Sequence, residues 1–201
     1  MSRVRAFSRT RAIRTGALLA ASAWIFTPHA LGGQTPSRAR PAGRTQVLEE
    51  LVLANHIVTN EGAVDGLGHV SARDPERPDR FWLSRAMAPA LVSARDLMEY
   101  DLEGKPVRDA GAPMYGERFI HAALYQARPD VKAIVHCHTP SVLPFANTGV
   151  VMRPMFQMSS FLAAGAPVFE IRQVESAKGM LVTNLRLGEA LASTLGKPPS
   201  S

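Results

Sequence analysis

The stretch YGERFIHAALYQARPDVKAIVHCHT, residues 115–139, carries the strongest indication of the fold in this sequence. Its first half repeats apolar residues at helical spacing, which predicts a helix over residues 115–127 that ends at 128–130. Residues 131–135 are rich in β-branched side chains and predict a strand that runs directly into His136-Cys137-His138. Thr139 and Pro140 then supply a capping residue and a proline for the first turn of another helix.

The same interleaving of helices and strands continues outside this stretch. Apolar residues at helical spacing, capping residues and runs of alternating side chains between turn signals mark the further elements. They predict helices over residues 46–60, 93–100 and 185–195, and strands over residues 69–73, 80–84, 168–171 and 179–182. Because strands and helices alternate along the chain, we expect a layered α/β or α+β fold.

Composition and charge place this fold in one globular domain preceded by a basic tail. The chain has 201 residues, 46% of them hydrophobic, and a formal charge of +6. Residues 1–45 hold eight arginines and no acid, which leaves 15 basic against 17 acidic residues, a charge of −2, for the rest of the chain. This balance excludes a basic nucleic-acid surface on the domain. The lone Cys137 cannot form an intrachain disulfide, and we expect it to be a small buried hydrophobic residue.

The first 32 residues have the layout of a secretory signal peptide. A basic stretch precedes the apolar run of residues 16–26, and small residues at Ala30 and Gly32 suit cleavage after Gly32. The apolar run is shorter than the ~20 residues that a membrane-spanning helix needs, so we expect no permanent membrane span. The prediction is a periplasmic or secreted protein with a linker at residues 33–45 and a domain at 46–201; a basic organellar presequence is the alternative.

His136 and His138 are the candidate metal ligands. Two residues apart on a strand, they point to one face with Cα atoms about 6.6 Å apart, a span that two imidazoles can close on one ion. Neutral imidazole suits zinc first and other divalent ions after it, whereas a hydrogen-bonded pair at a strand end is the alternative. Glu117 and His121 share one face of the preceding helix. Spacing alone favours a solvated carboxylate for Glu117, and a core hydrogen bond or a solvated position over ligation for His121.

Together with GHVSAR at residues 68–73 and DLEG at 101–104, the 115–139 stretch resembles the central signature of class II aldolase/adducin proteins. The resemblance implies a three-layer α/β/α domain with a central, largely antiparallel sheet, and a homotetramer with its active site at a subunit interface. It makes His136 and His138 two of three zinc ligands and Glu117 the catalytic acid/base. The implied activity is a divalent-metal-dependent lyase that cleaves a C–C bond through a metal-stabilised enolate.

Two departures from the family pattern bear on the substrate. Sugar-phosphate members carry Asn where this chain has His69, and a Ser-Ser pair where it has Tyr115-Gly116, so a phosphate cradle is not expected. An aromatic-tolerant pocket resembles instead the branch that decarboxylates aromatic acids, and an arginine can hold the carboxylate. The substrate-binding candidates are His69, Ser71, Arg73, Ser84 and Tyr115.

The sequence contains no histidine after His138, although the family takes its third zinc ligand from a later strand. We therefore expect a domain that is incomplete at its C-terminal end: a fragment of a longer product, an inactive relative, or a site completed by a neighbouring subunit. The leading hypothesis is decarboxylation or aldol cleavage of a small oxo or phenolic acid. The alternatives are a sugar-phosphate aldolase or epimerase, an adducin-like binding or assembly module, and a small metal-binding protein that adds His69 to the histidine pair.

Overall fold

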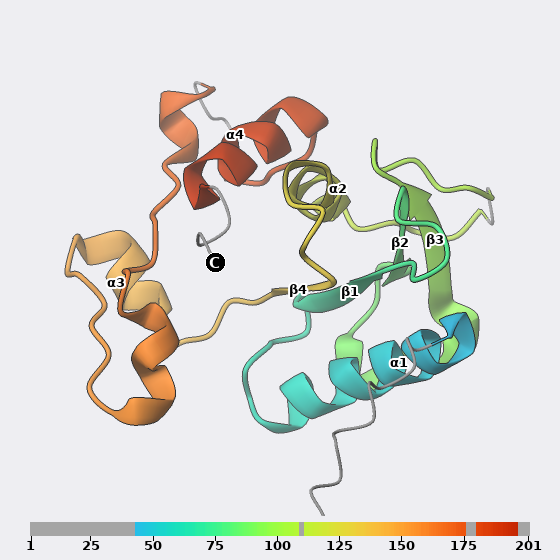
Figure 1. Cartoon of the computed structure of the whole chain (residues 1–201), viewed down its shortest axis with the longest axis horizontal. Coiled ribbons are helices and arrows are strands. Elements are labelled where there is room, and N and C mark those ends of the chain that lie inside the picture. Colours follow the sequence, from blue (N-terminus) through green and yellow to red (C-terminus); the bar gives the residue numbers. More distant parts are fainter. Residues whose placement is uncertain (1–42, 109–110, 176–179, 197–201) are drawn as a thin grey trace, which may run out of the picture. The chain divides into compact units, whose positions relative to one another are not determined.

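A four-stranded antiparallel sheet lies at the centre of the computed structural model, which describes residues 43–108, 111–175 and 180–196 (Figure 1). The strands lie in the order β3-β2-β1-β4. Their bounds are His69–Arg73 for β1, Arg80–Ser84 for β2, Leu97–Asp101 for β3 and Ala133–His136 for β4. The expected signal peptide, residues 1–32, and residues 33–42 of the expected linker fall outside the described residues.

Strand β1 is the element that organises the site. It pairs with β2 on one side and, across sixty residues of sequence, with β4 on the other. In the second pairing His69 lies opposite His136, and Ser71 lies opposite Ile134. Residues directly opposite each other in a sheet project from the same face. The β1–β4 register therefore places the side chains of His69 and His136 side by side.

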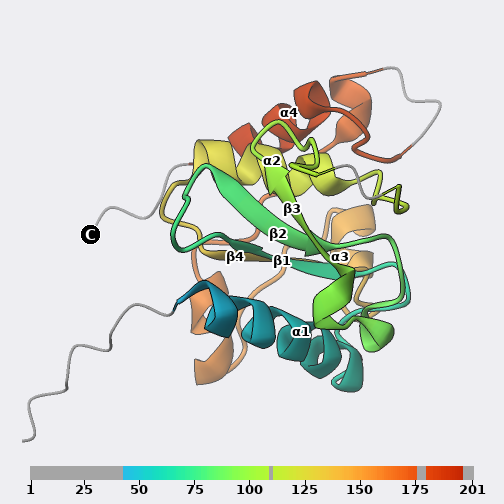
Figure 2. The ribbon, with the colours of Figure 1, turned by 90° about the vertical axis from the view of Figure 1, so that its right-hand side faces the viewer.

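Helices cover both faces of the sheet, which confirms the predicted three-layer architecture (Figure 2). Helix α1, Arg44–Asn60, packs on one face, where Leu51 contacts Val70 and Ala72 of β1 in a buried apolar cluster. Helix α2, Arg118–Ala127, packs on the other face, where Ala122 and Tyr125 join Phe81 and Leu83 of β2. Trp82, between Phe81 and Leu83 on β2, packs against the α1 cluster instead, because the side chains of a strand alternate between the two faces.

Helix α4, Leu185–Leu195, packs against α2 rather than against the sheet. The contact is close at Gly188, where a Cβ atom would lie 2.4 Å from the carbonyl oxygen of Phe119. Around it the two helices share a buried apolar cluster that includes Ile120, Leu124 and Leu187. The absence of a side chain at position 188 lets the two backbones approach, so α4 holds α2 from the side that faces away from the sheet.

The predicted helix over residues 93–100 is wrong. Ser93 does act as a cap, but only for a single 3-10 turn, Ala94–Asp96, and residues 97–101 then form β3. Met98 and Tyr100 are buried in alternation with half-buried neighbours, as a strand requires, and β3 pairs with β2 along its whole length. Pairing with a ready neighbour outweighs the local helix signal, because it satisfies the backbone groups of both strands.

The predicted strands over residues 168–171 and 179–182 are also wrong in the described part of the chain. Residues 168–170 and 180–182 form no strand, and Ile171–Gln173 is a 3-10 turn whose Ile171 is buried between α2 and α4. The helix expected from residue 139 begins later, as α3, Leu143–Thr148. Across residues 43–108, 111–175 and 180–196, no helix has the length and apolar character to cross a membrane.

Candidate metal centre and active site

Three potential ligands converge at the end of β4. One oxygen of Glu117 and one ring nitrogen each of His136 and His138 all lie within 4.8 Å of one another. The Nε2 atoms of the two histidines are 3.1 Å apart, and Nε2 of His136 is 3.3 Å from Oε2 of Glu117. His136 is the last residue of β4, His138 follows two residues later, and Glu117 is the N-cap of α2. The structure thus brings together the histidine pair and the acid that the sequence singled out.

The spacing of these atoms fits a shared cation. Two atoms bound about 2.1 Å from one tetrahedral ion lie roughly 3.4 Å apart, close to the two separations just given. Two imidazoles and one carboxylate are also a donor set found in catalytic zinc sites. The three side chains are half-buried, so the centre has both a protein wall and access from solvent.

Glu117 is held in its ionised form. A hydrogen bond from His136 is the main reason that the pKa of Glu117 lies below its usual range, and the remaining histidines add to this effect against the opposing effect of burial. An ionised carboxylate can bind a cation or accept a proton, and it cannot donate one. The geometry therefore prepares Glu117 to act as a ligand or as a base.

His69 lies beside the centre and is a neutral ring. Burial is the main cause that lowers the pKa of His69 to about 4. Its Nδ1 is 3.0 Å from the carbonyl oxygen of Leu67, so Nδ1 carries the hydrogen and Nε2 carries the lone pair. The ring stacks on Tyr115 with 4.1 Å between centroids and lies 4.8 Å from the ring of His136. Tyr115 is itself fixed, because its hydroxyl donates to the carbonyl of Met87.

A ladder of polar side chains continues from the centre between α2 and β1. Four residues rise about 6 Å along a helix and two residues rise about 6.6 Å along a strand, so every fourth helix residue can face every second strand residue. The ladder consists of Glu117, His121 and Tyr125 from α2, and of His69, Ser71 and Arg73 from β1. Ser71 Oγ lies 2.6 Å from Nδ1 of His121 and 2.9 Å from the hydroxyl of Tyr125. His121 is therefore a fully buried core histidine, which is one of the two positions that the sequence favoured over ligation.

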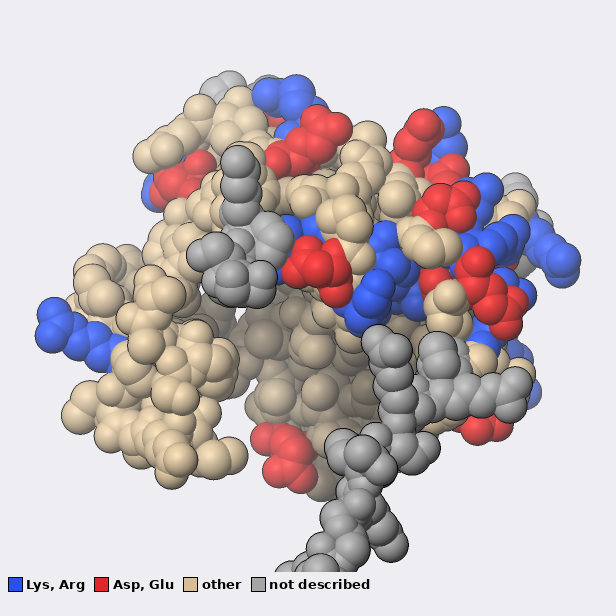
Figure 3. Space-filling model, in the orientation of Figure 1, with Lys and Arg blue, Asp and Glu red and all other residues tan. Residues whose placement is uncertain are grey.

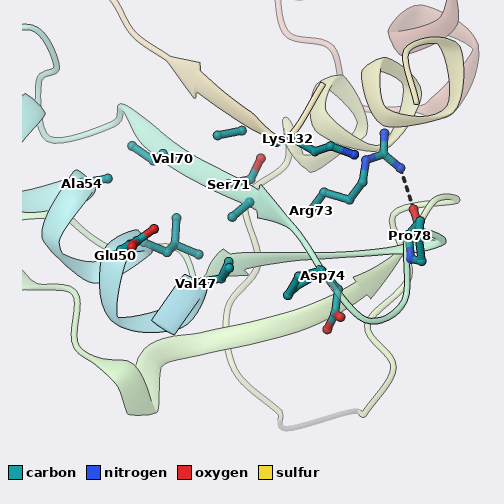
Figure 4. Close-up of a pocket in the computed structure, with 13 residues that line it drawn as sticks. Val47, Glu50, Ala54, Val70, Ser71, Arg73, Asp74, Pro78 and Lys132 are labelled. Atoms are coloured by element: carbon teal, nitrogen blue, oxygen red, sulfur yellow. Dashed lines mark hydrogen bonds between the residues drawn. The ribbon is translucent and has the colours of Figure 1, made fainter. Parts of the chain in front are cut away.

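Arg73 ends the ladder as an anchor for the backbone. Its guanidinium donates to the carbonyl oxygens of Tyr125 at 2.6 Å, Arg128 at 3.0 Å, Val131 at 3.0 Å and Pro78 at 2.5 Å. Figure 4 shows this side chain extending from β1 toward α2. These bonds tie β1 to the end of α2, to the β1–β2 connection and to the segment before β4, and they direct the guanidinium to the backbone rather than into the centre.

Ser84, a further substrate-binding candidate, lies away from the centre. Its neighbour Leu83 faces α2, so alternation along β2 turns Ser84 to the face that carries α1. Ser84 is fully buried there, and its hydroxyl has no hydrogen-bond partner among the described residues.

Cys137 is exposed, so the prediction of a buried hydrophobic residue is wrong. Its Sγ lies 3.2 Å from the hydroxyl of Thr139. By alternation with His136, Cys137 points to the face of the sheet that carries α1. Because α1 packs mainly against β1, side chains at β4 on this face, such as Val135, remain half exposed.

A cavity of about 630 Å³ opens on that same face, between α1 and the β1–β4 pair (Figure 4). Val47 and Ala54 of α1 and Val70 of β1 line it, with Glu50 and Lys132 among its charged residues. None of the three converging ligands contributes to its lining, so this cavity is separate from the candidate centre.

Sequence reasoning missed Asp65, which contacts the centre from the turn before β1. Its carboxylate lies 3.1 Å from Nδ1 of His138 and accepts hydrogen bonds from the backbone N–H groups of Leu67 and Gly68. These bonds, that of Leu67 first, lower the pKa of Asp65. The signal was an aspartate three residues before a glycine in a tight turn, a pattern typical of side-chain bonding to the backbone.

A three-layer domain with a Glu and a His-x-His pair gathered at the end of one strand defines a candidate metal-dependent enzyme domain. The chain belongs to the class II aldolase and adducin family, since the model of the class II aldolase and adducin N-terminal domain matches residues 49–200.

Two curated relatives carry decarboxylase names. The chain is 41% identical over 150 residues to decarboxylase tropJ of Talaromyces stipitatus, a match that covers 72% of this chain and 56% of the relative. It is 31% identical over 182 residues to a 3,4-dihydroxyphthalate decarboxylase of Arthrobacter keyseri, covering 83% and 68%. The chain thus spans little more than half the length of the first relative and two thirds of the second.

A solved structure confirms the fold. The L-fuculose 1-phosphate aldolase of Glaciozyma antarctica superposes with a TM-score of 0.63 at 27% identity, over 81% of this chain and 62% of that chain.

Proposed function

We propose that this domain binds the metal and supplies the acid/base of a C–C lyase that decarboxylates a small phenolic or oxo acid. The observation that carries the proposal is the convergence of Glu117, His136 and His138 on one point with separations of 3.1 and 3.3 Å. Membership of the family and relatives named as decarboxylases support the reaction class. Zinc is the proposed metal, because neutral imidazole and carboxylate together suit it.

When bound, the divalent cation supplies Lewis acidity that stabilises negative charge on a substrate oxygen. His136 and His138 would hold it through their Nε2 atoms. Glu117 acts on protons: its ionised oxygen takes a proton from a hydroxyl of the substrate and returns it to the carbon that loses carbon dioxide. The transfer leaves the substrate oxygen as an anion, and this oxygen takes one proton from water when the product leaves, because decarboxylation of a carboxylate consumes one proton.

The wall beside the centre supports an aromatic substrate. Tyr115 and His69 form a stacked pair of planar rings next to His136, where a flat substrate can lie against them. His69 is neutral and offers no charge to a phosphate. Among the substrate-binding candidates, His69 and Tyr115 are therefore the two we retain at the centre, with Ser71 and Arg73 as supports of the ladder behind it.

The test uses the full chain loaded with Zn²⁺ and two sets of substrates. Ortho-hydroxylated aromatic acids such as 3,4-dihydroxyphthalate report decarboxylation as released carbon dioxide, and L-fuculose 1-phosphate reports aldol cleavage. We expect turnover of the first set only. Glu117→Gln should lower this turnover by about 100-fold or more while zinc still binds through His136 and His138. Glu103→Gln, at an exposed glutamate paired with Lys105, is the matched control.

Three results would overturn the proposal. Retained turnover in Glu117→Gln would remove the acid/base role, and zinc binding that survives both His136→Ala and His138→Ala would place the metal elsewhere. Cleavage of the sugar phosphate alone would favour the aldolase alternative, which the likeness to the L-fuculose 1-phosphate aldolase supports.

We further propose that the chain is exported and assembles as a homo-oligomer, with the resemblance favouring a tetramer. The leader of residues 1–32 supports export, which mass analysis of the mature N-terminus in a periplasmic or culture fraction tests.

An apolar surface segment supports assembly. The segment of residues 140–168 holds Arg153 as its single charged residue and exposes large apolar side chains (Figure 3). Met155, Phe156, Met158 and Phe161 are each at least 67% exposed, more than a lone soluble domain usually shows in one segment. Light scattering on the full chain tests the oligomer.

A further inference from the structure

The turn of residues 61–68 holds the metal-ligand segment at two points. The hydroxyl of Thr139 donates to the carbonyl oxygen of Ala63 at 2.7 Å, and the carboxylate of Asp65 lies 3.1 and 3.3 Å from Nδ1 of His138. A further close contact lies at Gly68, where a Cβ atom would be 2.5 Å from Cβ of Val64 and 3.1 Å from the carbonyl oxygen of His136. The turn therefore packs directly against the strand end that carries the candidate ligands.

The Asp65–His138 contact fixes where the imidazole carries its hydrogen. An ionised carboxylate only accepts hydrogen bonds, so the ring nitrogen that faces Asp65 must be an N–H group. In a neutral imidazole the other nitrogen then carries the lone pair, and in His138 this is Nε2, the atom 3.1 Å from Nε2 of His136.

We propose that Asp65 is a positioning residue of the metal centre, which holds His138 in the tautomer whose Nε2 lone pair faces Glu117 and His136. This inference rests on the proposed function in that His138 is a metal ligand. A carboxylate behind a ligating histidine orients the ring and strengthens it as a donor, and loss of such a partner commonly costs 10- to 100-fold in metal affinity.

The two oxygens of Asp65 serve different tasks. Oδ1 accepts the N–H groups of Leu67 at 3.0 Å and Gly68 at 2.9 Å, and so shapes the turn that delivers His69 to the start of β1. Oδ2 makes the nearer contact with His138, at 3.1 Å. Asp65 thus sets both the position of the buried His69 ring beside the centre and the tautomer of His138.

The decisive variant is Asp65→Asn. The amide oxygen can still accept the two backbone N–H groups, whereas the amide NH₂ group can only donate toward Nδ1 of His138. The ring should then place its hydrogen on Nε2 and lose the lone pair that faces the centre. Thr139→Val is the matched control, because it removes the other tie between the turn and the segment and leaves the ligand tautomer alone.

Two measurements on the full chain test the inference. In metal-free protein at pH 8, long-range ¹⁵N–¹H correlations should show His138 with its hydrogen on Nδ1 in the wild type and on Nε2 in Asp65→Asn. Competition with a chromophoric chelator should give a Zn²⁺ Kd that is 10- to 100-fold higher in Asp65→Asn and within about 3-fold of wild type in Thr139→Val. Circular dichroism confirms that each variant is folded.

A wild-type His138 with its hydrogen on Nε2, or an unchanged Zn²⁺ Kd in folded Asp65→Asn, would overturn the role of Asp65. An equal loss of affinity in Thr139→Val would also overturn it, since the effect would then come from loosening the turn. The failure of the proposed function looks different: wild-type protein would show the Nδ1–H tautomer of His138 but bind no zinc.

Discussion

The buried carboxylate of Asp74 should make the free energy of unfolding of this domain depend on pH in the acid range. Asp74 follows β1 directly, and its side chain is fully buried. It accepts a hydrogen bond from Nε of Arg44 at 2.8 Å, one from Nε1 of Trp82 at 2.8 Å, and two from the backbone N–H groups of Glu76 and Arg77 at 2.8 and 2.9 Å. It therefore joins the start of α1, the β1–β2 connection and the second strand.

These bonds give the pH dependence its sign. Burial by itself would raise the pKa of Asp74, but the bonds from Arg44, Trp82 and the backbone outweigh it and lower the pKa to about 2. The unfolded value is about 3.9. Because the folded pKa is the lower one, the stabilisation is complete above pH 4 and is lost as the pH falls through 2. A difference of nearly two units at about 1.4 kcal/mol each amounts to about 2–3 kcal/mol.

The variant Asp74→Asn removes the titration and keeps the shape. We expect urea unfolding to show a free energy of unfolding about 2–3 kcal/mol below wild type at pH 7, with the gap closing between pH 4 and pH 2. Asp79→Asn, at an exposed aspartate 3.6 Å from Arg80, is the control and should follow the wild-type curve. Parallel acid curves for wild type and Asp74→Asn would refute the reasoning.

Three further substitutions test the packing around the site. Gly188→Ala places a methyl group 2.4 Å from the carbonyl oxygen of Phe119, so we expect a loss of about 1–3 kcal/mol in thermal unfolding; an unchanged Tm would contradict the close helix contact. Arg73→Met removes one donor from each of four backbone carbonyls, of which that of Arg128 keeps the N–H of Val131, and should cost about 2–4 kcal/mol in urea; a loss below 1 kcal/mol would mean that water replaces the guanidinium. Ser71→Ala leaves the buried Nδ1 of His121 without its serine partner and should lower the free energy of unfolding by about 1–3 kcal/mol. Equal stability of the variant and the wild type would contradict this.

Elements with a strong local pattern were predictable from the sequence. The observed bounds lie within three residues of the predicted ones for α1, α2, α4, β1 and β2. In these elements the spacing of apolar residues indicates both the type of secondary structure and the face that is buried. The 115–139 stretch also identified the family, which the domain match at residues 49–200 confirms.

Elements that depend on a neighbour were not predictable. Residues 97–101 form a strand because β2 offers them an edge, whereas residues 168–170 pair with no strand of the described sheet. The exposure of Cys137 has the same origin, since α1 covers β1 and leaves the adjacent face of β4 open.

For the site, the sequence by itself determined the residue types and their local spacing: two histidines two apart, and a glutamate at the start of the helix before them. Only the tertiary structure decided what those groups face. The contact of Asp65 with His138 joins residues 73 positions apart, and that of Ser71 with His121 joins residues 50 apart. Such contacts depend on the β1–β4 register and on the height at which α2 crosses β1. The packing of whole layers sets both quantities, and no local pattern in the chain records them.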